Sequence, residues 1–282
     1  MPHILIAEGT PVSWQTERTN LGLPPNFSLF AAALHGHHPD IHCVGLNIAD
    51  GEPFPRGVAL ADFDGVMVPG SPLHVYDETP FVARQIDFLR SAFAIGLPVW
   101  GSCWGLQVAT VALGGSVRRN PRGRELAIAR AITITEAGRH HPLLASRPPV
   151  FDALCSHLDE IETLPPDAEI LAANEISAVQ AMAARTPQGG SFFGTQYHPE
   201  HTLLVSAALI ELRASELVAE GFGERAEIVA MAGDYRKLAA EPARRDLIWR
   251  YGIASEIIDP IRRTTEIGNW LRTVVEPRRL AA

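Results

Sequence analysis

The chain of 282 residues is 46% hydrophobic and 20% charged, which suits one large globular domain or a domain of ordinary size with an extension. A formal net charge of −8 argues against general affinity for nucleic acid or for an anionic membrane surface. No apolar run approaches the roughly 18 residues of a membrane-spanning helix. No signal peptide stands at the start, and an odd number of cysteines fits a reducing compartment, so we expect a cytoplasmic protein.

Short apolar runs alternate with longer amphipathic stretches in the first part of the chain. The pattern predicts strands at 3–7, 41–47, 63–68 and 97–100. It predicts helices at 27–34, 80–94 and 106–113, and a long loop at 10–25. Strands that alternate with helices of this length form βαβ units. We therefore expect an α/β fold with a doubly wound, mostly parallel sheet of the flavodoxin-like type.

The second part of the chain has a different pattern. Two further strands are expected at 127–135 and 190–197, and the chain turns helical after Glu200, first as one amphipathic helix at 203–219. Residues 221–223, Gly-Phe-Gly, interrupt it, so we place a catalytic domain at 1–220 and a helical extension at 221–282. The extension is predicted to form two or three helices, broken near 241–242, 252 and 259–260.

The apolar residues of this extension are too numerous to remain in water, yet the unit is small for independent stability. We expect it to pack on the catalytic domain or on a second copy of the chain, giving a homo-oligomer. Lys237 is the single lysine among 24 basic residues, so the chain has no lysine-containing phosphate loop. A structural or oligomerising role is therefore favoured over activation of an acceptor.

Cys103 is the strongest candidate for a nucleophile. It lies in Gly101-Ser102-Cys103-Trp104-Gly105, between a predicted strand and a predicted helix. A sharp turn of this kind displays its central side chain at the carboxyl edge of the sheet, and the flanking glycines avoid clashes. The N–H groups and dipole of the helix N-terminus favour a thiolate. The alternative is a cysteine packed in a glycine-rich turn, the interpretation that we also give to Cys43 and Cys155.

A second signal favours catalysis over that alternative. An apolar strand ends in Tyr197-His198-Pro199-Glu200, and residues two apart at a strand end project to the same side. Glu200 can therefore bind one nitrogen of the His198 ring and leave the other to take the thiol proton. The competing interpretation is a surface histidine and glutamate at a strand terminus.

Four segments together resemble the class I (triad) glutamine amidotransferases, above all the glutaminase domains of the GMP synthetase type. They are Pro69-Gly70-Ser71-Pro72 with Val75-Tyr76, Gly101-Ser102-Cys103-Trp104-Gly105-Leu106-Gln107, Ser156-His157-Leu158-Asp159, and Gln196-Tyr197-His198-Pro199-Glu200. They occur in the order of the family, and the resemblance covers about residues 1–220. Ser71 stands where the family usually has a glycine, and a positive φ there would strain a serine.

The resemblance implies a role for each matching residue. Cys103 is the nucleophile, His198 the general base and acid, and Glu200 the residue that orients the imidazole. The amide N–H groups of Ser71 and Trp104 form the oxyanion hole. The substrate-binding residues are Gly70, Gln107, Ser156 and His157, and the reaction needs no metal and no organic cofactor.

The expected activity is hydrolysis of the γ-amide of L-glutamine through a Cys103 thioester, with ammonia released to an acceptor that a separate synthetase subunit supplies. Three alternatives remain open. They are a free-standing hydrolase of γ-glutamyl conjugates, a transferase that passes the glutamyl group to an amine, and a catalytically silent interaction module.

A histidine cluster and an arginine-rich loop are two further candidate binding sites. His35, His37 and His38 lie close together, but a helix-ending loop explains their presence better than a metal site. The loop at 118–125 carries four arginines and is either a solvated connection or an anion site beside the active centre.

Overall fold

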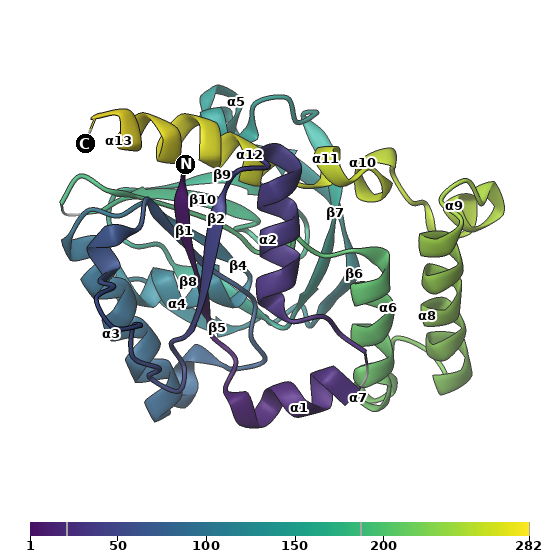
Figure 1. Ribbon diagram of the computed structural model, residues 1–282. Coiled ribbons are helices and arrows are strands. Elements are labelled where there is room, and N and C mark those ends of the chain that lie inside the picture. The colour runs from purple at the N-terminus through teal and green to yellow at the C-terminus, as the bar shows by residue number, and fades with distance from the viewer. Residues whose placement is uncertain (21, 187, 282) are drawn as a thin grey trace.

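A computed structural model describes residues 1–20, 22–186 and 188–281. Within these residues a nine-stranded sheet forms the centre of the molecule (Figure 1). Its spatial order is β2 (His42–Asn47), β1 (His3–Glu8), β3 (Gly65–Val68), β4 (Val99–Ser102), β11 (Ser191–Thr195), β10 (Ala181–Arg185), β9 (Ala168–Ala173), β6 (Glu125–Ile134) and β7 (Val150–His157). The first five strands are parallel and follow the 2-1-3-4-5 order of flavodoxin-like sheets, which confirms the predicted fold class.

The remaining four strands are antiparallel and widen the sheet on one side. A separate ribbon pairs β5 (Ser116–Arg119) with β8 (Asp159–Thr163). The described helices are α1 (Val12–Asn20), α2 (Asn26–His37), α3 (Pro80–Ala94), α4 (Trp104–Ala112), α5 (Glu136–His140), α6 (Leu203–Leu212), α7 (Ala214–Ala219), α8 (Arg225–Ala240), α9 (Arg245–Tyr251), α10 (Ser255–Ile258), α11 (Pro260–Arg263), α12 (Thr265–Trp270) and α13 (Glu276–Ala281). None of them is both long and apolar enough to cross a membrane.

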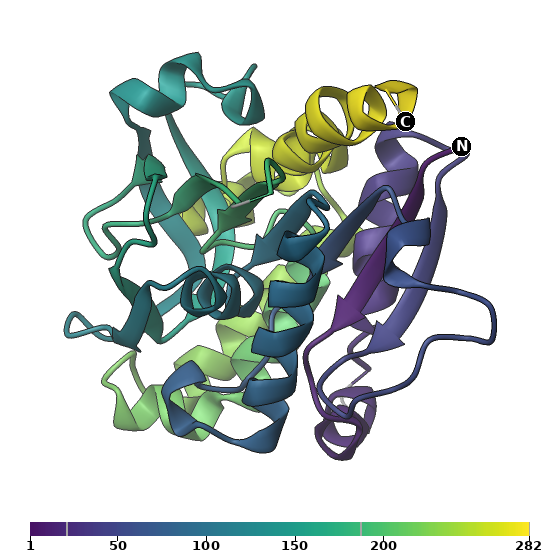
Figure 2. The same cartoon turned by 90° about the vertical axis from the view of Figure 1, so that its left-hand side faces the viewer.

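Helices cover both faces of the sheet because its central strands are apolar on both faces. In β1, Leu5 and Ala7 join the core beneath α3 and α4, whereas Ile4 and Ile6 join the core beneath α2 and α12. Figures 1 and 2 show these two layers from different sides. The parallel strands are thus fixed on both faces, and their carboxyl ends converge at one edge of the sheet.

Two sequence predictions about helices are wrong. The segment at 10–25 contains α1, a mostly exposed and polar helix, so apolar periodicity gave no sign of it. The helix predicted at 203–219 is two helices, α6 and α7, which meet at Arg213. The predicted breaks in the extension are present, but they separate shorter and more numerous helices than expected, within the residues described.

The C-terminal helix α12 lies against the middle of the sheet. Trp270 is fully buried, and a Cβ at Gly65 of β3 would lie 2.8 Å from its ring. On the other side of α12, a Cβ at Gly268 would lie 2.4 Å from the His37 ring of α2. Glycine is therefore required at both positions for the helix to approach this closely, and α12 belongs to the main core.

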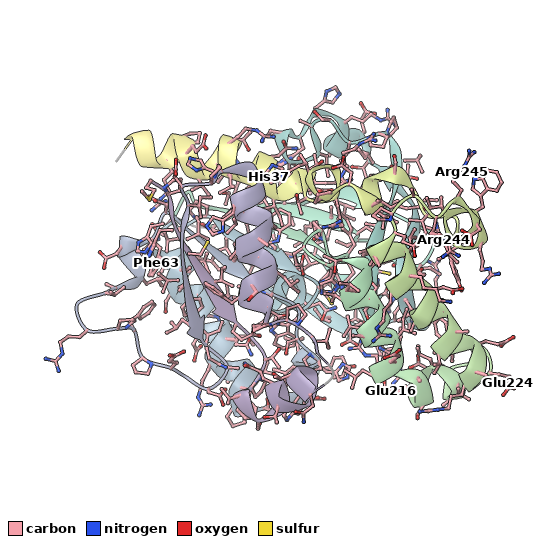
Figure 3. The ribbon with its side chains drawn as sticks, turned by 45° about the vertical axis from the view of Figure 1, so that its right-hand side comes forward. His37, Phe63, Glu216, Glu224, Arg244 and Arg245 are labelled. Carbon is pink, nitrogen blue, oxygen red and sulfur yellow. The ribbon has the colours of Figure 1, made fainter. Side chains whose placement is uncertain are left out.

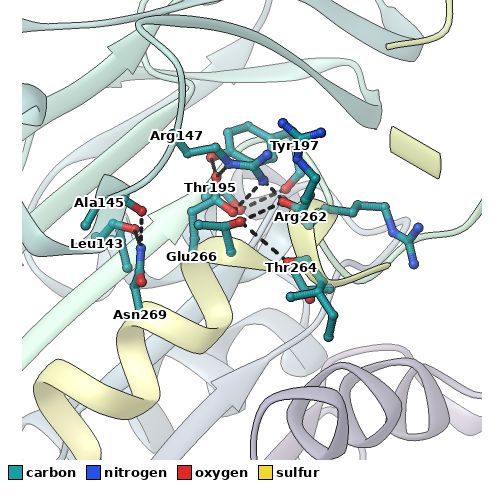
Figure 4. A network of polar contacts seen from close by, with 12 residues as sticks. Leu143, Ala145, Arg147, Thr195, Tyr197, Arg262, Thr264, Glu266 and Asn269 are labelled. Carbon is teal, nitrogen blue, oxygen red and sulfur yellow. Dashed lines mark hydrogen bonds and ion pairs between the residues drawn. The ribbon is translucent and has the colours of Figure 1, made fainter. Parts of the chain in front are cut away.

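A buried ion pair fastens α12 beside β11 (Figure 4). The Glu266 carboxylate is wholly buried and accepts two hydrogen bonds of 2.7 Å from the Arg147 guanidinium. The Tyr197 hydroxyl donates a third hydrogen bond to Glu266, at 2.6 Å. Because these groups are buried together, each depends on the others for compensation of its lost hydration.

The rest of the extension packs elsewhere on the molecule. Residues of α8, α9 and α10 form a hydrophobic cluster with α6 and with Leu154 of β7. Glu224 and Arg245 lie on its outer side, away from the sheet (Figure 3). The helices at 225–281 thus pack on the sheet and on α6, whereas the predicted domain boundary at 221 and the homo-oligomer remain predictions.

Removing the charge of Glu266 should destabilise the fold strongly. We expect Glu266→Gln to lower the free energy of unfolding by about 3–5 kcal/mol, because Arg147 then stays buried without its counter-charge. The matched control is Glu136→Gln, which breaks the exposed Arg139–Glu136 pair and should cost at most about 1 kcal/mol. Urea denaturation of both variants measures the difference, and equal losses would show that the buried pair is no anchor.

Candidate active site

The sequence-predicted catalytic residues follow the carboxyl ends of neighbouring strands. Gly70 and Ser71 follow β3, Cys103 follows β4, and His198 and Glu200 follow β11. Ligand sites of open α/β sheets lie at this edge, because the loops that leave the strands converge there. The sheet order thus brings together segments that lie up to 130 residues apart in the chain.

Cys103 occupies a strained turn between β4 and α4. Its φ of 50° and ψ of −102° are unusual for a residue with a side chain. A Cβ at Gly101 would lie 2.4 Å from the carbonyl carbon of Gly105, and a Cβ at Gly105 would lie 2.1 Å from the oxygen of Val68. The two glycines therefore permit the tight turn, and Cys103 stands at the N-terminus of α4.

His198 and Glu200 form a buried pair beside this cysteine. His198 Nδ1 lies 2.7 Å from Glu200 Oε1, and both side chains are almost completely buried. The His198 ring also has a hydrogen bond with the Cys103 side chain. A Cβ at Gly70 would lie 2.6 Å from His198 Cε1, so glycine is needed at position 70 for the ring to occupy this place.

The electrostatic setting of His198 favours its charged form. Burial is the largest single influence and lowers the pKa of the imidazole. The charge of Glu200 and the hydrogen bonds with Cys103 and Glu200 together outweigh burial and raise the pKa of His198 to about 9. The ring is thus held as an imidazolium at neutral pH, next to the thiol.

Two residues behind the pair were not found by sequence reasoning. The Ser102 hydroxyl donates to Glu200 Oε2 at 3.0 Å, and the Trp100 indole N–H donates to the Ser102 oxygen, also at 3.0 Å. Both side chains are completely buried, so they fix the second oxygen of the carboxylate. The one available signal was a serine at the end of an apolar strand, directly before the cysteine.

The predicted oxyanion-hole residues share a support. The Gly9 carbonyl accepts hydrogen bonds from the Ser71 hydroxyl at 3.1 Å and from the Gln85 amide at 3.0 Å. The Gln85 oxygen accepts from the Trp104 indole at 2.7 Å. Ser71 is not among the described residues with positive φ, so the strain considered for a serine at this position is not present.

A cavity of about 400 Å³ opens above Cys103. Its lining includes Ser71, His74, Gln107, Arg119, Arg124, Ser156, His157, Asp159 and Arg213. All three predicted substrate-binding side chains beyond the loop at 70–71 therefore reach this cavity. Arg119 and Arg124, from the predicted loop at 118–125, also line it, but Arg119 belongs to strand β5 and the loop itself is shorter than predicted.

The predicted substrate-binding residues differ in which of their polar atoms already have hydrogen-bond partners within the protein. Gln107 donates its amide to Gln196 Oε1 at 3.2 Å, which directs the amide nitrogen into the protein. Both nitrogens of the His157 ring have protein partners, Glu125 Oε2 at 2.8 Å and the Asp159 carbonyl at 3.0 Å. The His157 ring thus positions its own segment, and contact with a ligand falls to the backbone there.

An ion pair and a hydrogen bond connect the loop after β3 to the segment at 156–159, and both segments line the cavity. His74 Nδ1 lies 2.6 Å from Asp159 Oδ2, and the Tyr76 hydroxyl donates to Asp159 Oδ1 at 3.0 Å. The hydrogen bond with Asp159, opposed by burial, raises the pKa of His74. This ion pair joins the two segments, and it weakens when rising pH removes the proton from His74.

A third histidine lies next to the buried pair. The His201 ring stacks on the His198 ring, with centroids 3.7 Å apart and planes 3° apart, and His201 Nε2 lies 3.8 Å from Glu200 Oε1. These three residues are close enough to hold a metal ion. However, imidazole lone pairs lie in the ring plane, so parallel rings do not converge on one ion without reorienting. The arrangement suits proton chemistry better than metal binding.

Comparison with known proteins agrees with this geometry. The family model for glutamine amidotransferase class-I matches residues 45–212. The chain is 32% identical to a γ-glutamyl-L-1-hydroxyisopropylamide hydrolase from Pseudomonas sp., over 97% of this chain and 93% of that protein. The chain belongs to the class-I glutamine amidotransferase family.

Relatives within this family differ in how much of their length is shared. The GMP synthase of Thermomicrobium roseum is 35% identical over 62% of this chain, but the match spans only 32% of the synthase. Among solved structures, a glutamine amidotransferase from Methylobacillus flagellatus has a TM-score of 0.63 at 21% identity and covers 97% of this chain and 95% of its own. One from Thermotoga maritima has a TM-score of 0.61 at 16% identity, over 95% of this chain and 98% of its own. Both share the fold.

The three cysteines of this amidotransferase-family chain should react at different rates. Burial raises the pKa of Cys43 to about 11 and the pKa of Cys155 well above its usual range, so both stay protonated at neutral pH. Iodoacetamide at pH 7 should therefore label Cys103 first, because Cys103 alone has a helix N-terminus and a neighbouring imidazole. Peptide mass spectrometry measures the order, and earlier labelling of Cys43 or Cys155 would contradict the assignment.

The titration of His198 should depend on Glu200. In the unaltered protein the imidazole should titrate near pH 9, and Glu200→Gln should lower that pKa because burial remains while the opposing charge is gone. A raised pKa stabilises the fold at pH values below the unfolded value of about 6.5. This stabilisation is lost as the pH rises through 9. NMR of the ring protons checks the shift, with Glu136→Gln as the control that should leave it unchanged.

Proposed function

We propose that this protein hydrolyses the amide bond of γ-glutamyl amides through a thioester on Cys103. The observation that carries the proposal is the hydrogen-bonded set of Cys103, His198 and Glu200 at the floor of a 400 Å³ cavity. A nucleophile, a proton carrier and a group that orients the carrier are the parts that acyl transfer requires. In this mechanism the steps need no organic cofactor and no metal ion.

The first half of the reaction forms the thioester. The Cys103 sulfur attacks the γ-carbonyl carbon, and the backbone N–H groups of Ser71 and Trp104 stabilise the oxyanion that develops. The His198 imidazolium then donates its proton to the amide nitrogen as the carbon–nitrogen bond breaks and the amine leaves. Glu200 keeps the ring oriented and stabilises its positive charge.

The second half regenerates the enzyme. His198, now neutral, removes a proton from a water molecule, and the hydroxide attacks the thioester carbonyl. The carbon–sulfur bond breaks, glutamate leaves, and the thiolate–imidazolium pair forms again. The Gln107 oxygen, with the backbone of Ser156 and His157, is placed to bind the glutamyl group during both halves. A thiol nucleophile must stay reduced, which suits a cytoplasmic location.

The leaving amine is an alkylamine rather than ammonia in our proposal. The support is the end-to-end likeness to a γ-glutamyl-L-1-hydroxyisopropylamide hydrolase, which extends through the C-terminal helices. Those helices pack on the catalytic core through α12. A hydrolase that acts alone needs no partner subunit to receive its product.

Glutamine itself is the second candidate substrate. The family match and the likeness to GMP synthases over 62% of this chain favour it, and the ammonia would then pass to a separate synthetase subunit. The four sequence motifs also favour this activity. Transfer of the glutamyl group to an amine and a silent interaction module are the remaining alternatives, and both are outcomes of the test below.

Purified protein should release ethylamine from γ-glutamyl ethylamide with a higher kcat/KM than it releases ammonia from glutamine. Cys103→Ser should lose activity by at least about a thousandfold, because the hydroxyl is far less ionised than the thiol, whereas Cys43→Ser should retain it. Amine and glutamate are quantified separately. Faster release of ammonia from glutamine would reverse the order of the two candidates, and a γ-glutamyl adduct of added amine would indicate a transferase. No turnover of either substrate would contradict the proposed function.

A further inference from the structure

Arg213 stands at the break between α6 and α7, which the sequence pattern did not predict. The α6 backbone ends there with φ −95° and ψ 10°, and α7 begins at the next residue. From this position Arg213 lines the active-site cavity. Its Nη1 donates a hydrogen bond to the hydroxyl of Ser156, a residue of the substrate-binding segment.

The position of Arg213 in the cavity separates it from the other arginines. It lines the 400 Å³ cavity with Gln107 and also a small adjoining cavity that contains Cys103 and His198. Arg119 lines the large cavity only and belongs to the exposed ribbon strand β5. Arg124 also lines the large cavity only, and it donates hydrogen bonds to both oxygens of Glu220 and to one of Glu216.

The two cavities correspond to the two ends of an amide substrate. His198 donates a proton to the departing amine and lines only the small cavity, which is therefore the side of the leaving group. Gln107 and His157 line only the large cavity, which is the side of the glutamyl group. A glutamyl group carries an α-ammonium and an α-carboxylate there, and each needs an opposite charge or hydrogen bonds to replace water.

We propose that Arg213 binds the α-carboxylate of the glutamyl group, and so restricts the enzyme to γ-glutamyl compounds in which this carboxylate is free. The inference rests on the proposed function. The planar guanidinium matches a carboxylate with two parallel hydrogen bonds, a geometry that lysine cannot reproduce. The contact with Ser156 fixes where the group stands. Glutamine residues within a polypeptide, whose α-carboxyl group is in a peptide bond, are excluded as substrates.

To test this proposal, kcat/KM is measured for the unaltered protein and for Arg213→Gln on each of two substrates. The substrates are γ-glutamyl ethylamide and 4-aminobutanoyl ethylamide, which lacks only the α-carboxylate. Arg213→Gln should lower kcat/KM roughly 10- to 100-fold on the first substrate, the range expected for a lost hydrogen bond to a charged group. The same variant should change kcat/KM on the second substrate by less than about threefold, because the interaction is then absent from both enzymes.

Two further variants sharpen the result. Arg213→Lys should retain part of the kcat/KM on γ-glutamyl ethylamide that Arg213→Gln loses, because lysine keeps the positive charge but lacks the paired N–H groups of the guanidinium. Arg225→Gln is the matched control, since Arg225 Nη1 also donates to a serine hydroxyl, that of Ser215, outside the cavity. It should leave both substrates unaffected. Equal loss on both substrates in Arg213→Gln would overturn the proposal, as would the same selective loss in Arg119→Gln instead.

A measurement without turnover separates this inference from the proposed function. The chloroketone analogue of glutamine carries the same α-carboxylate, and the Cys103 thiolate displaces its chloride to form a thioether. Arg213→Gln should slow this inactivation roughly 10- to 100-fold, while inactivation by iodoacetamide stays the same. An unchanged chloroketone rate overturns the role of Arg213. Selective slowing in a protein that hydrolyses no γ-glutamyl amide would support that role and contradict only the proposed function.

Discussion

The buried ion pair of His198 and Glu200 is the interaction on which the rest of the site depends. Two ionised groups out of contact with water are costly unless every remaining hydrogen-bonding atom is satisfied. Ser102 provides for the second oxygen of Glu200, and Trp100 fixes Ser102 in turn. Only glycine at position 70 leaves room for the imidazole. The local sequence around the site is therefore dictated by the need to compensate and enclose one charge pair.

A second buried ion pair connects the candidate active site to the C-terminal helices. Tyr197 directly precedes His198 and donates a hydrogen bond to Glu266, the buried partner of Arg147. The ring of Trp270, one helical turn further on, packs edge-on against Trp100. Helix α12 thus packs on β4 and on the segment that follows β11, next to the candidate catalytic residues Cys103 and His198. The C-terminal helices therefore support the site, although none of their described residues lines the two cavities at Cys103.

Features of the site could be predicted from the sequence where all the residues that determine them lie in one short segment. The turn at Cys103 and the strand end at His198 each show their chemistry within about ten residues, and apolar runs mark the parallel strands. Prediction failed where the determinant lies in contacts between distant segments. The exposed helix α1 has no apolar stripe, and the roles of Gln85 and Ser102 arise from side chains brought together by the sheet. Arg213 gave no signal, because a break inside an apolar helix has no mark in composition.

The placement of the tryptophans gives this protein a built-in optical reporter. Trp100 and Trp104 lie on either side of Cys103 in the chain, and these two residues and Trp270 are completely buried, whereas Trp14 and Trp249 are 46% and 73% exposed. Excited indoles in an apolar core emit at shorter wavelengths than indoles in water. The short-wavelength part of the fluorescence therefore comes from Trp100 and Trp104, which are close to Cys103 in the chain, and from Trp270 of α12. Its intensity should follow events at the thiol without any added label.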